Sequence, residues 1–467
     1  MAKKYDYDFI CIGSGPACQR AAIQAAKKNE RVAVVEKNGV PGGVCLHTGT
    51  IPSKTFREAV LALPNGRNPF SHRGRKANGG QRPTADTLLK RVSHIEEREN
   101  WVLEDQLDRN RVEMIYGAAS FKDAHAIHVN STVEPHDITA DKILIGVGTN
   151  PARPADVPLD SRSVITSDEI LELDELPRSM VVIGCGVIGI EYASMFATFG
   201  VDVTAIDARE RPLESLDHEV VDELIHQMRN RNVKFRLGER VDHIDVSKNG
   251  QRRAVVHLES GKRVVADVAL YAIGRSGATE HLDLDAAGLQ ADSRGRIKVN
   301  DRFRTEVPNI YAAGDVIGFP SLACTSAEQG RLAACHAFGV KAGRMAAHFP
   351  VGIYSIPEIS AVGQSEEELT RNKVPYESGV ARYREISRGQ ILGDDSGFLK
   401  MLFHRKTSRL LGVHTIGTGA TELVHIGQTV LGMGGGLDYC MGTIFNYPTL
   451  AECYKVAAFD AYNKMNA

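Results

Sequence analysis

The sequence lacks any long uninterrupted apolar run. Its 467 residues are 43% hydrophobic and 24% charged, yet no stretch approaches the ~18 consecutive apolar residues that a membrane-spanning helix needs. The first residues, Met-Ala-Lys-Lys, lead directly into a strand-like segment, without the apolar core and small-residue cleavage site of a secretory signal. We therefore expect a protein with no membrane partner that works in the cytoplasm.

The sequence also has no excess of charge of either sign. Lysine and arginine together number 56 and the acidic residues 58, so the net charge is −2. A basic field of the kind that attracts nucleic acid is absent, and we expect no nucleic-acid partner. The 16 histidines are scattered along the sequence, so no metal site is expected.

Cysteine is present, but no two cysteines are spaced as a C-x-x-C or zinc motif. The expected state is eight reduced thiols, mostly small buried side chains, at Cys11, Cys18, Cys45, Cys185, Cys324, Cys335, Cys440 and Cys453.

Two segments do follow the strand–turn–helix–strand pattern of dinucleotide-binding folds. In the first, the apolar run Tyr7–Ile12 leads into a turn with Gly13 and Gly15, and a second apolar run ends at Glu36. The first glycine permits the tight turn, the second lets the backbone approach a pyrophosphate, and the acid accepts a hydrogen bond from a ribose hydroxyl. Cys18 stands at the third glycine position, so the packing of helix on strand must accommodate a thiol.

The second segment carries all three glycines of this pattern. The run Met180–Ile183 leads into Gly184, Gly186 and Gly189, and the strand after the helix ends at Asp207. Two such units predict two dinucleotides bound by one enzyme.

Residues 42–54 read G-G-V-C-L-H-T-G-T-I-P-S-K. They resemble the GG-x-C-x4-C-x-P-x-K signature of the FAD-dependent pyridine nucleotide:disulfide oxidoreductases, whose two cysteines form a redox disulfide. Cys45 stands at the first cysteine, but Thr50 stands at the second. Because a disulfide needs two sulfurs about 2 Å apart, we expect no disulfide reduction of the family's kind. Cys45 is then either a charge-transfer partner of the flavin or a small thiol packed beneath its ring.

The resemblance covers nearly the whole chain. Residues 145–151 are similar to the family's A-T-G-x-x-P crossing strand, and Thr305–Asp315 matches its second FAD motif, T-x-x-P-x-I-x-A-x-G-D. It implies that Asp315 accepts hydrogen bonds from the ribityl chain of FAD. The residues expected at FAD are Gly13, Gly15, Glu36, Gly43, Cys45, Lys54, Gly148, Gly314 and Asp315.

The fold class that follows is α/β, with two Rossmann-like dinucleotide-binding domains and a C-terminal α+β dimerisation domain. The FAD domain is expected over 1–150 and 276–345, the NAD(P) domain over 151–275, and the interface domain over 346–467. In the family this last domain pairs two subunits, so a homodimer or higher homo-oligomer is expected. Residues 64–83, rich in Gly, Asn, Pro and Arg, are predicted to be a surface loop.

A second departure from the family lies near the C-terminus. The disulfide reductases of the family end with the motif H-P-T-x-x-E. The histidine of this motif is the acid/base for the leaving thiolate, and the glutamate orients the histidine. Here Tyr447 stands at the histidine and Glu452 at the glutamate. A tyrosine of ordinary pKa near 10 is a poor base at neutral pH. Both departures remove parts of the same thiol reaction.

The flavin–nicotinamide half of the family's chemistry remains. Lys54 and Glu191 match the family's ion pair beside flavin N5 and the nicotinamide, and both are expected to be catalytic. Asp207 suits the 2′-OH of NAD, while Arg209 and Arg211 either chelate the 2′-phosphate of NADP or are simply solvated. The residues expected at NAD(P) are Gly184, Gly186, Gly189, Asp207, Arg209, Arg211 and Gly274.

At finer grain the chain resembles the soluble, energy-independent transhydrogenases within this family. The shared features are C-x-H-x-G-T-I-P-S-K, the segment from Gly274 to Gly277, and F-N-Y-P-T-x-A-E over 445–452. The implied reaction is Si-specific hydride transfer from NADPH through FAD to NAD, in ping-pong order. Two alternatives stay open: an NAD(P)H diaphorase or quinone reductase, and a non-catalytic subunit that keeps FAD for structure.

Overall fold

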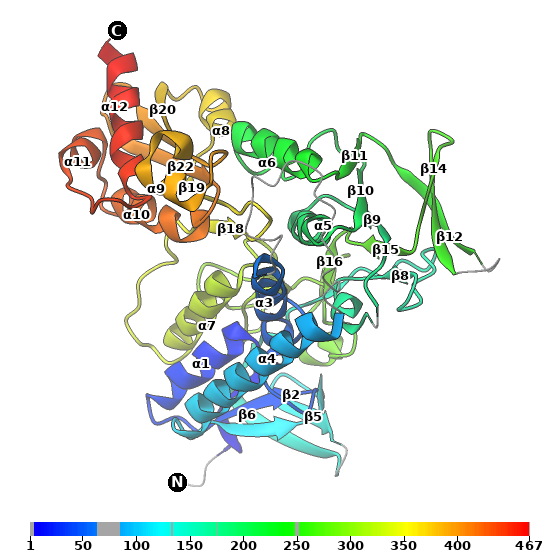
Figure 1. The fold of residues 1–467 in the computed structure, drawn as a ribbon. Helices are drawn as coiled ribbons and strands as arrows, with labels where there is room; N and C mark the ends of the chain where they lie inside the picture. Colours follow the sequence, from blue (N-terminus) through cyan, green and yellow to red (C-terminus); the bar gives the residue numbers. More distant parts are fainter. Residues whose placement is uncertain (1–3, 63–84, 132–133, 174, 248–251, 467) are drawn as a thin grey trace. The chain divides into compact units, whose positions relative to one another are not determined.

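The structure, a computed structural model, describes residues 4–62, 85–131, 134–173, 175–247 and 252–466. The chain divides into two compact units, each built from three segments (Figure 1). Unit 1 comprises Met1–Phe56, Leu89–Ala152 and Gly274–Met345, and unit 2 comprises Arg57–Leu88, Arg153–Ile273 and Ala346–Ala467. The predicted surface loop over 64–83 lies outside the described residues, and the predicted boundaries of three domains stay a prediction. No helix in the described part of the chain is long and apolar enough to cross a membrane.

Unit 1 is built on a seven-stranded sheet. Its order is β3-β2-β1-β6-β5-β4, and β17 pairs with β6. The strands β1, β2, β3, β6 and β17 are parallel, whereas β4 and β5 form an antiparallel extension. The strands are β1 (Tyr7–Ile12), β2 (Val32–Glu36), β3 (Glu113–Tyr116), β4 (Ala118–Phe121), β5 (Ala126–Asn130), β6 (His136–Ile145) and β17 (Ile310–Ala312). A separate two-stranded sheet pairs β7 (Thr149–Pro151) with β16 (Arg275–Gly277).

Both faces of β1 are buried, as expected for a parallel sheet. Phe9 and Cys11 belong to one apolar cluster, and Ile10 and Ile12 to another. The helices α1 and α7 lie side by side over the first face (Figure 1). They approach so closely that a Cβ on Gly330 would lie 1.9 Å from the carbonyl oxygen of Ala17. The helices that begin in unit 1 or border it are α1 (Pro16–Ala26), α2 (Gly43–His47), α3 (Thr50–Leu61), α4 (Ala85–Asp108) and α7 (Ala323–Ala337).

Unit 2 contains a second parallel sheet, of five strands in the order β11-β10-β9-β15-β8. A three-stranded antiparallel sheet, β12-β13-β14, follows β11 in the chain. The strands are β8 (Val164–Ile165), β9 (Ser179–Ile183), β10 (Asp202–Asp207), β11 (Lys234–Leu237), β12 (Val241–Ser247), β13 (Arg253–Leu258), β14 (Arg263–Ala266) and β15 (Val268–Tyr271). The helices are α5 (Val187–Phe199) and α6 (His218–Asn230).

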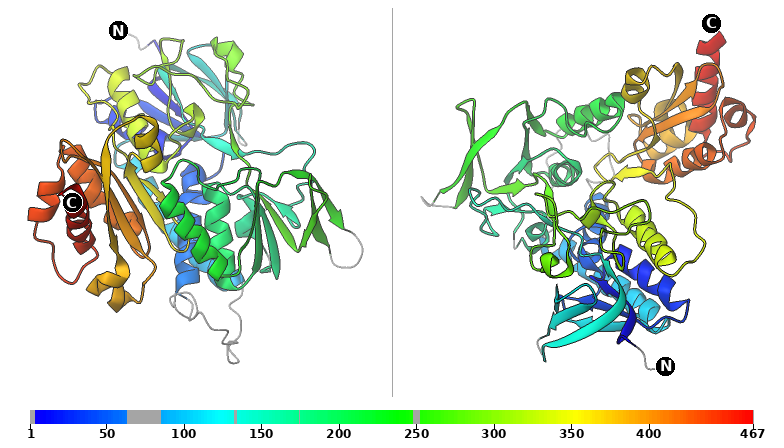
Figure 2. Two further views of the ribbon diagram at one scale, coloured as in Figure 1. Left: turned by 90° about the horizontal axis from the view of Figure 1, so that it is seen from above. Right: turned by 180° about the vertical axis from the view of Figure 1, so that it is seen from behind.

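The C-terminal part of unit 2 is an antiparallel sheet in the order β18-β19-β22-β21-β20. The helix α12 packs on β20 so closely that a Cβ on Gly379 would lie 1.9 Å from the carbonyl oxygen of Ala457. Figure 2 shows this sheet and the red C-terminal helix from two further sides. The strands are β18 (Val351–Ile353), β19 (Ile359–Gly363), β20 (Tyr376–Arg382), β21 (Phe398–His404) and β22 (Leu410–Ile416). The helices are α8 (Glu366–Arg371), α9 (Ser387–Leu392), α10 (Ala420–Gly432), α11 (Leu437–Gly442) and α12 (Glu452–Asn466).

The predicted fold class is confirmed: two sheets of the dinucleotide-binding kind, one parallel and one parallel with an antiparallel extension, and a C-terminal α+β part. The first strand has the predicted bounds, Tyr7–Ile12. The helix after the second glycine turn starts at Val187, so Gly189, the third glycine of the motif, lies in its first turn.

Candidate dinucleotide-binding and active site

The first glycine turn joins β1 to α1. Gly13 has a φ of +98°, and a Cβ there would lie 2.7 Å from the carbonyl oxygen of Gly146. Gly15 is the N-cap of α1 and offers no side chain to the first turn of that helix. The capped helix α8 differs, since Ser365 accepts a hydrogen bond from the backbone N–H of Glu368. The first N–H groups of α1 therefore remain available for an anion such as a pyrophosphate.

Glu36 is connected to this turn through Ser14. The Ser14 hydroxyl donates to the Glu36 carboxylate at 2.5 Å, and the Ser14 backbone N–H donates to the same oxygen at 3.1 Å. The backbone N–H of Asn38 donates to the other carboxylate oxygen at 2.8 Å. The backbone N–H of Gly42 donates to the Ser14 hydroxyl at 2.8 Å. Ser14 thus joins the turn, the acid and the segment that leads to Cys45.

The thiol at the third glycine position is accommodated by a glycine on another strand end. A Cβ on Gly146, directly after β6, would lie 2.4 Å from the sulfur of Cys18. The Cys18 thiol also lies 3.4 Å from the carbonyl oxygen of Ile12, to which it donates. In the usual motif the third glycine, on the helix, leaves room for close packing against the strand. Here Gly146, at the end of β6, leaves that room instead.

A pocket of unit 1 brings together several of the predicted FAD residues. The volume of the pocket is about 660 Å³ when the part open to solvent is included. Gly15 and Gly148 have no heavy atom within 4 Å of where a Cβ would be, so both leave open space beside the backbone. The pocket is lined by Gly15, Pro16, Ala17, Gly43, Val44, Cys45, Thr50, Gly146, Val147, Gly148, Thr149, Gly314, Asp315, Ser321, Ala323 and Ser326.

Asp315 lies half-buried in this pocket, three residues after the end of β17. The Ser326 hydroxyl donates to its carboxylate at 3.3 Å, and Gln329 accepts the backbone N–H of Gly314 at 2.9 Å. Burial raises the pKa of Asp315, and the charge of Arg275 and the Ser326 hydrogen bond oppose that rise. The carboxylate is thus held at the pocket wall with accepting capacity left for a ligand hydroxyl.

Cys45 and Thr50 both line the same pocket, on α2 and at the start of α3. Burial raises the pKa of the Cys45 thiol above its ordinary value, more than its hydrogen bond with Thr50 and the charge of Lys54 lower it. All eight cysteines of the chain are free. The group beside Cys45 is a hydroxyl, which cannot store two electrons as a disulfide does.

The second glycine turn joins β9 to α5 in unit 2. Gly184 has a φ of +100°, and a Cβ there would lie 2.7 Å from the carbonyl oxygen of Ala272. A Cβ on Gly189 would lie 1.9 Å from the carbonyl oxygen of Gly184, so here the third glycine is sterically required. Gly186 is the N-cap of α5, again without a side-chain cap. This helix start also has free backbone donors for an anion.

Asp207 at the end of β10 is paired with Arg209. The guanidinium of Arg209 donates to both carboxylate oxygens, at 2.9 and 2.8 Å, and the backbone N–H of Cys185 donates at 2.6 Å. Burial alone would raise the pKa of Asp207, but these donors hold it below its ordinary value. Arg211 instead pairs with Asp222 on α6. The arginine side chain beside Asp207 is therefore Arg209, and it is 41% exposed.

Of the two predicted catalytic residues, Glu191 lies on α5 and is only 3% exposed. Its carboxylate accepts the backbone N–H of Tyr354 at 2.8 Å. Lys54 lies on α3, where its ammonium donates to the Ser53 hydroxyl at 3.3 Å. The two residues belong to different units, as do Gly274 and the second glycine turn. Their pairing at one site stays a prediction.

Tyr447 projects from the segment between α11 and α12 and is 65% exposed. Its hydroxyl forms a hydrogen bond of 2.7 Å with the hydroxyl of Ser387. One carboxylate oxygen of Glu452 is buried without a hydrogen-bond partner among the described residues. The frame of the family's acid/base motif is thus present, with no imidazole in it.

Comparison with known proteins agrees with this geometry. Residues 7–330 match the family described as pyridine nucleotide-disulphide oxidoreductase, and residues 349–458 match its dimerisation domain. The chain belongs to this family. The resemblance inferred from the sequence motifs is therefore confirmed.

Similar members of the family can be named. Over 464 residues the chain is 52% identical to a soluble pyridine nucleotide transhydrogenase of Mycobacterium bovis, covering 99% of this chain and 98% of that protein. It is 43% identical to a protein of the same name from Colwellia psychrerythraea over the full length of both. Among solved structures, the HOCl-induced flavoprotein disulfide reductase RclA of Escherichia coli matches with a TM-score of 0.87 and 26% identity, covering 97% of this chain and 99% of that one.

Several residues at the family's FAD pocket were not found from the sequence. Ser14 lies between the two motif glycines and has no role in the sequence motif, although its hydroxyl reaches the acid at the end of β2. Ser326 and Gln329 are one helical turn apart on α7 and hold Asp315 and Gly314. The available signal was the three-residue spacing between them, on the helix that follows the Gly-Asp motif.

Proposed function

We propose that this protein is a FAD-dependent soluble NAD(P) transhydrogenase, which converts NADPH and NAD into NADP and NADH. The observation that carries the proposal is the hydroxyl of Thr50 beside the Cys45 thiol in the pocket wall. An enzyme of this family without a second sulfur needs another acceptor, and a second nicotinamide is the acceptor that the chain's own binding motifs supply. The proteins named soluble pyridine nucleotide transhydrogenase, at 43% and 52% identity, support it.

The residues of unit 1 fit FAD. The uncapped start of α1 suits the pyrophosphate, and Glu36 has lone pairs left for a ribose hydroxyl. Gly43 packs against Gly15, since a Cβ on Gly43 would lie 3.1 Å from the Cα of Gly15. Because neither residue has a side chain, the backbone on both sides of the pocket is free to approach a flat ligand. When bound, FAD supplies an isoalloxazine that takes a hydride from one nicotinamide and gives it to the next.

The proposed roles of the chain's own residues are electrostatic. Lys54 places a cation near the isoalloxazine, where it favours negative charge without transferring a proton. Glu191 holds its carboxylate near the nicotinamide, buried on α5 and fixed by Tyr354. No residue has to act as a base, because a hydride moves without a separate proton. The exposed hydroxyl of Tyr447 is consistent with this.

The pairing of Asp207 with Arg209 suits a site that takes both nicotinamides in turn. With NAD, the carboxylate accepts a hydrogen bond from the 2′-OH while Arg209 neutralises its charge. With NADP, the exposed guanidinium of Arg209 turns from the carboxylate toward the 2′-phosphate. One nicotinamide then leaves before the other enters, which is the ping-pong order. The Si-specific stereochemistry of the transfer follows from the family resemblance.

We also propose that the protein is a cytoplasmic homodimer. The C-terminal part of unit 2 exposes several large apolar side chains, as an interface would before assembly. They are Ile391, Met433, Tyr439, Ile444, Tyr447, Phe459 and Tyr462. The matched dimerisation domain over 349–458 includes most of them.

The direct test is to mix the purified FAD-loaded protein with NADPH and thio-NAD and to follow thio-NADH. We expect turnover with parallel lines in double-reciprocal plots, as a ping-pong reaction gives. Rapid bleaching of the flavin by NADPH without thio-NADH formation would contradict the proposal. If a quinone then restored turnover, the protein would be a diaphorase or quinone reductase. NADPH that carries deuterium on one face of its C4 atom would test the stereochemistry of the transfer in the same assay.

A further inference from the structure

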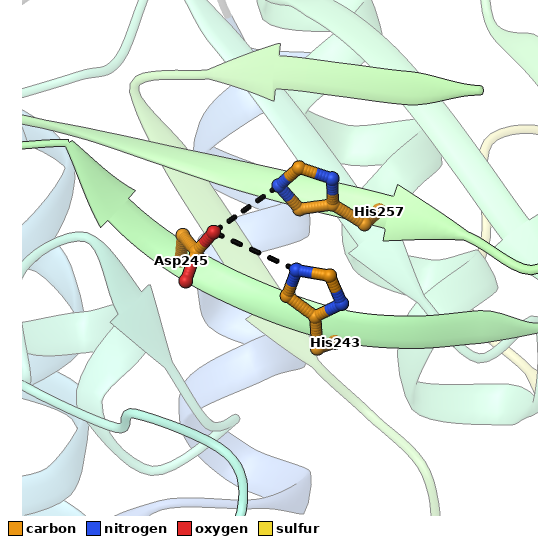
Figure 3. Close-up of side chains that lie close together, drawn as sticks. All are labelled: His243, Asp245 and His257. Carbon is orange, nitrogen blue, oxygen red and sulfur yellow. Dashed lines mark ion pairs between the residues drawn. The ribbon is translucent and has the colours of Figure 1, made fainter. Parts of the chain in front are cut away.

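Three potential metal ligands meet on the antiparallel sheet of unit 2. His243 and Asp245 come from β12 and His257 from β13, and both imidazoles face one carboxylate oxygen (Figure 3). That oxygen of Asp245 lies 3.2 Å from Nε2 of His257 and 3.6 Å from Nε2 of His243. All three ligand atoms lie within 4.8 Å of one another. The side chains are 51%, 64% and 30% exposed for His243, Asp245 and His257, so solvent ions reach them.

The strand register creates this arrangement. His243 is directly opposite His257 in the antiparallel pair, and Asp245 follows two residues along β12 on the same face. The two imidazole rings stack with centroids 4.2 Å apart and an interplanar angle of 10°. An irregularity in the register lies between Val241 and His243. Such bulges often re-aim side chains.

The distances suit a small divalent ion. With metal–ligand bonds of about 2.0–2.1 Å, neighbouring ligand atoms of a tetrahedral site lie about 3.3 Å apart. The two nitrogen–oxygen distances already bracket that value. The two nitrogens lie within 4.8 Å of each other, and exposed side chains can adjust to the tetrahedral separation.

A neighbouring acid orients one of the imidazoles. Nδ1 of His243 lies 2.8 Å from the carboxylate of Asp242 and donates a hydrogen bond to it. This hydrogen bond leaves the lone pair on Nε2, the nitrogen that faces Asp245. Carboxylates commonly orient metal-binding histidines in this way.

We propose that His243, Asp245 and His257 bind one divalent transition-metal ion of the zinc class, with water completing the coordination. Two imidazoles and a carboxylate suit Zn²⁺, Ni²⁺ or Cu²⁺ better than Mg²⁺ or Ca²⁺. The ion joins β12 to β13 and takes no part in hydride transfer. The scattered histidines of the sequence gave no sign of it, because strand register brings the third ligand to the other two.

The chain offers a matched control on the sheet of unit 1. His128 lies 2.8 Å from Asp137, and their side chains are 41% and 44% exposed. This is a histidine–carboxylate pair of similar exposure without a second imidazole in the described contacts. Its substitution measures what an ordinary surface pair contributes to metal uptake.

The experiment is titration of the FAD-loaded protein with Zn²⁺ alone, by isothermal calorimetry and by equilibrium dialysis. Relative to the unsubstituted protein, His243→Asn with His257→Asn should lose one equivalent of bound Zn²⁺, and His128→Asn should lose none. Asp242→Asn should weaken the same site about tenfold, as loss of an orienting partner does. Circular dichroism and transhydrogenation, unchanged in all variants, show that each is folded.

The proposal is overturned if the double variant binds Zn²⁺ as the unsubstituted protein does, or if His128→Asn loses as much. Should the double variant fail to fold, His257→Asn alone decides, with at least a tenfold weaker site expected. A failure here leaves the proposed transhydrogenation untouched, because that activity is measured without added metal.

Discussion

The two glycine turns of this chain have the same backbone plan but differ in the partners of their acids. In unit 1, Glu36 receives hydrogen bonds from Ser14 and Asn38, all from uncharged donors. In unit 2, Asp207 is paired with the guanidinium of Arg209. A site for one permanent ligand needs only to orient a hydroxyl. A site that exchanges two ligands differing by a phosphate benefits from a mobile counter-charge.

The turns also differ in where they place the space for close helix packing. Gly189 supplies it on the helix in unit 2, whereas Gly146 supplies it on the strand side in unit 1, opposite Cys18. The same steric requirement can thus be met from either side of the contact. Close packing therefore requires a glycine on one of the two contacting segments, and not at one fixed position of the motif.

The largest effect is expected from Gly189→Ala. Its Cβ would overlap the carbonyl oxygen of Gly184 at 1.9 Å, which displaces the start of α5. A displacement of about 1 Å costs on the order of a hundredfold in rate, so flavin reduction by NADPH and by NADH should both fall by that factor, measured by stopped-flow. FAD content should stay unchanged. Gly432→Ala is the matched control, since it adds the same methyl group to α10 of unit 2, where the Cβ would meet no atom within 4 Å beyond its chain neighbours and its own helix, and an equal loss of reduction rate in both variants would contradict the prediction.

The corresponding change in unit 1 is Gly146→Ala, whose Cβ would lie 2.4 Å from the Cys18 sulfur. Overpacking of this kind costs about 1–3 kcal/mol, and we expect a lower melting temperature and reduced FAD content by absorbance. Adding Cys18→Ala should restore much of both, because it removes the colliding sulfur. If the double variant were no better than the single one, Gly146 would not be compensating for Cys18.

An effect smaller than that of Gly189→Ala is expected from Arg209→Gln. Without the guanidinium, the unscreened Asp207 carboxylate repels a 2′-phosphate, and loss of a hydrogen bond between charged groups costs about 1.5–3 kcal/mol. The KM for NADPH should rise at least about tenfold, whereas the KM for NADH should change little. Arg211→Gln, which removes the pair with Asp222, should affect NADPH less. Equal changes for both nucleotides in Arg209→Gln would show that Arg209 does not discriminate between them.

The smallest effect is expected from Cys45→Ala. Because burial raises the pKa of this thiol above its ordinary value of 9.0, Cys45 is protonated at pH 7 and loses its proton only in more alkaline solution. The flavin spectrum at pH 7 should therefore show no long-wavelength thiolate charge-transfer band, and transhydrogenation should stay within about twofold. A band at pH 7 that disappears in the variant would contradict the prediction.

The features that could be predicted from the sequence are local ones. Both glycine turns, the acids that end β2 and β10, and the Gly314–Asp315 motif lie within short segments whose backbone requirements fix the residue types. The contacts that could not be predicted join distant segments. Cys18 and Gly146 meet only because β1 and β6 are neighbours in the sheet. The pairing of Lys54 with Glu191 still depends on the family resemblance.

The uncapped helix starts described above have a consequence for the stability of the protein. In the proposed function a dinucleotide takes the place of the missing cap at α1 and at α5, so each ligand would become part of the secondary structure that binds it. In the proposed ping-pong reaction FAD stays at α1, whereas the nicotinamide leaves α5 in every half-reaction. The helix α5 therefore has to persist alone between ligands, and its almost wholly buried sequence, from Gly189 to Ala197, lets packing hold it in place while its N-terminus is open.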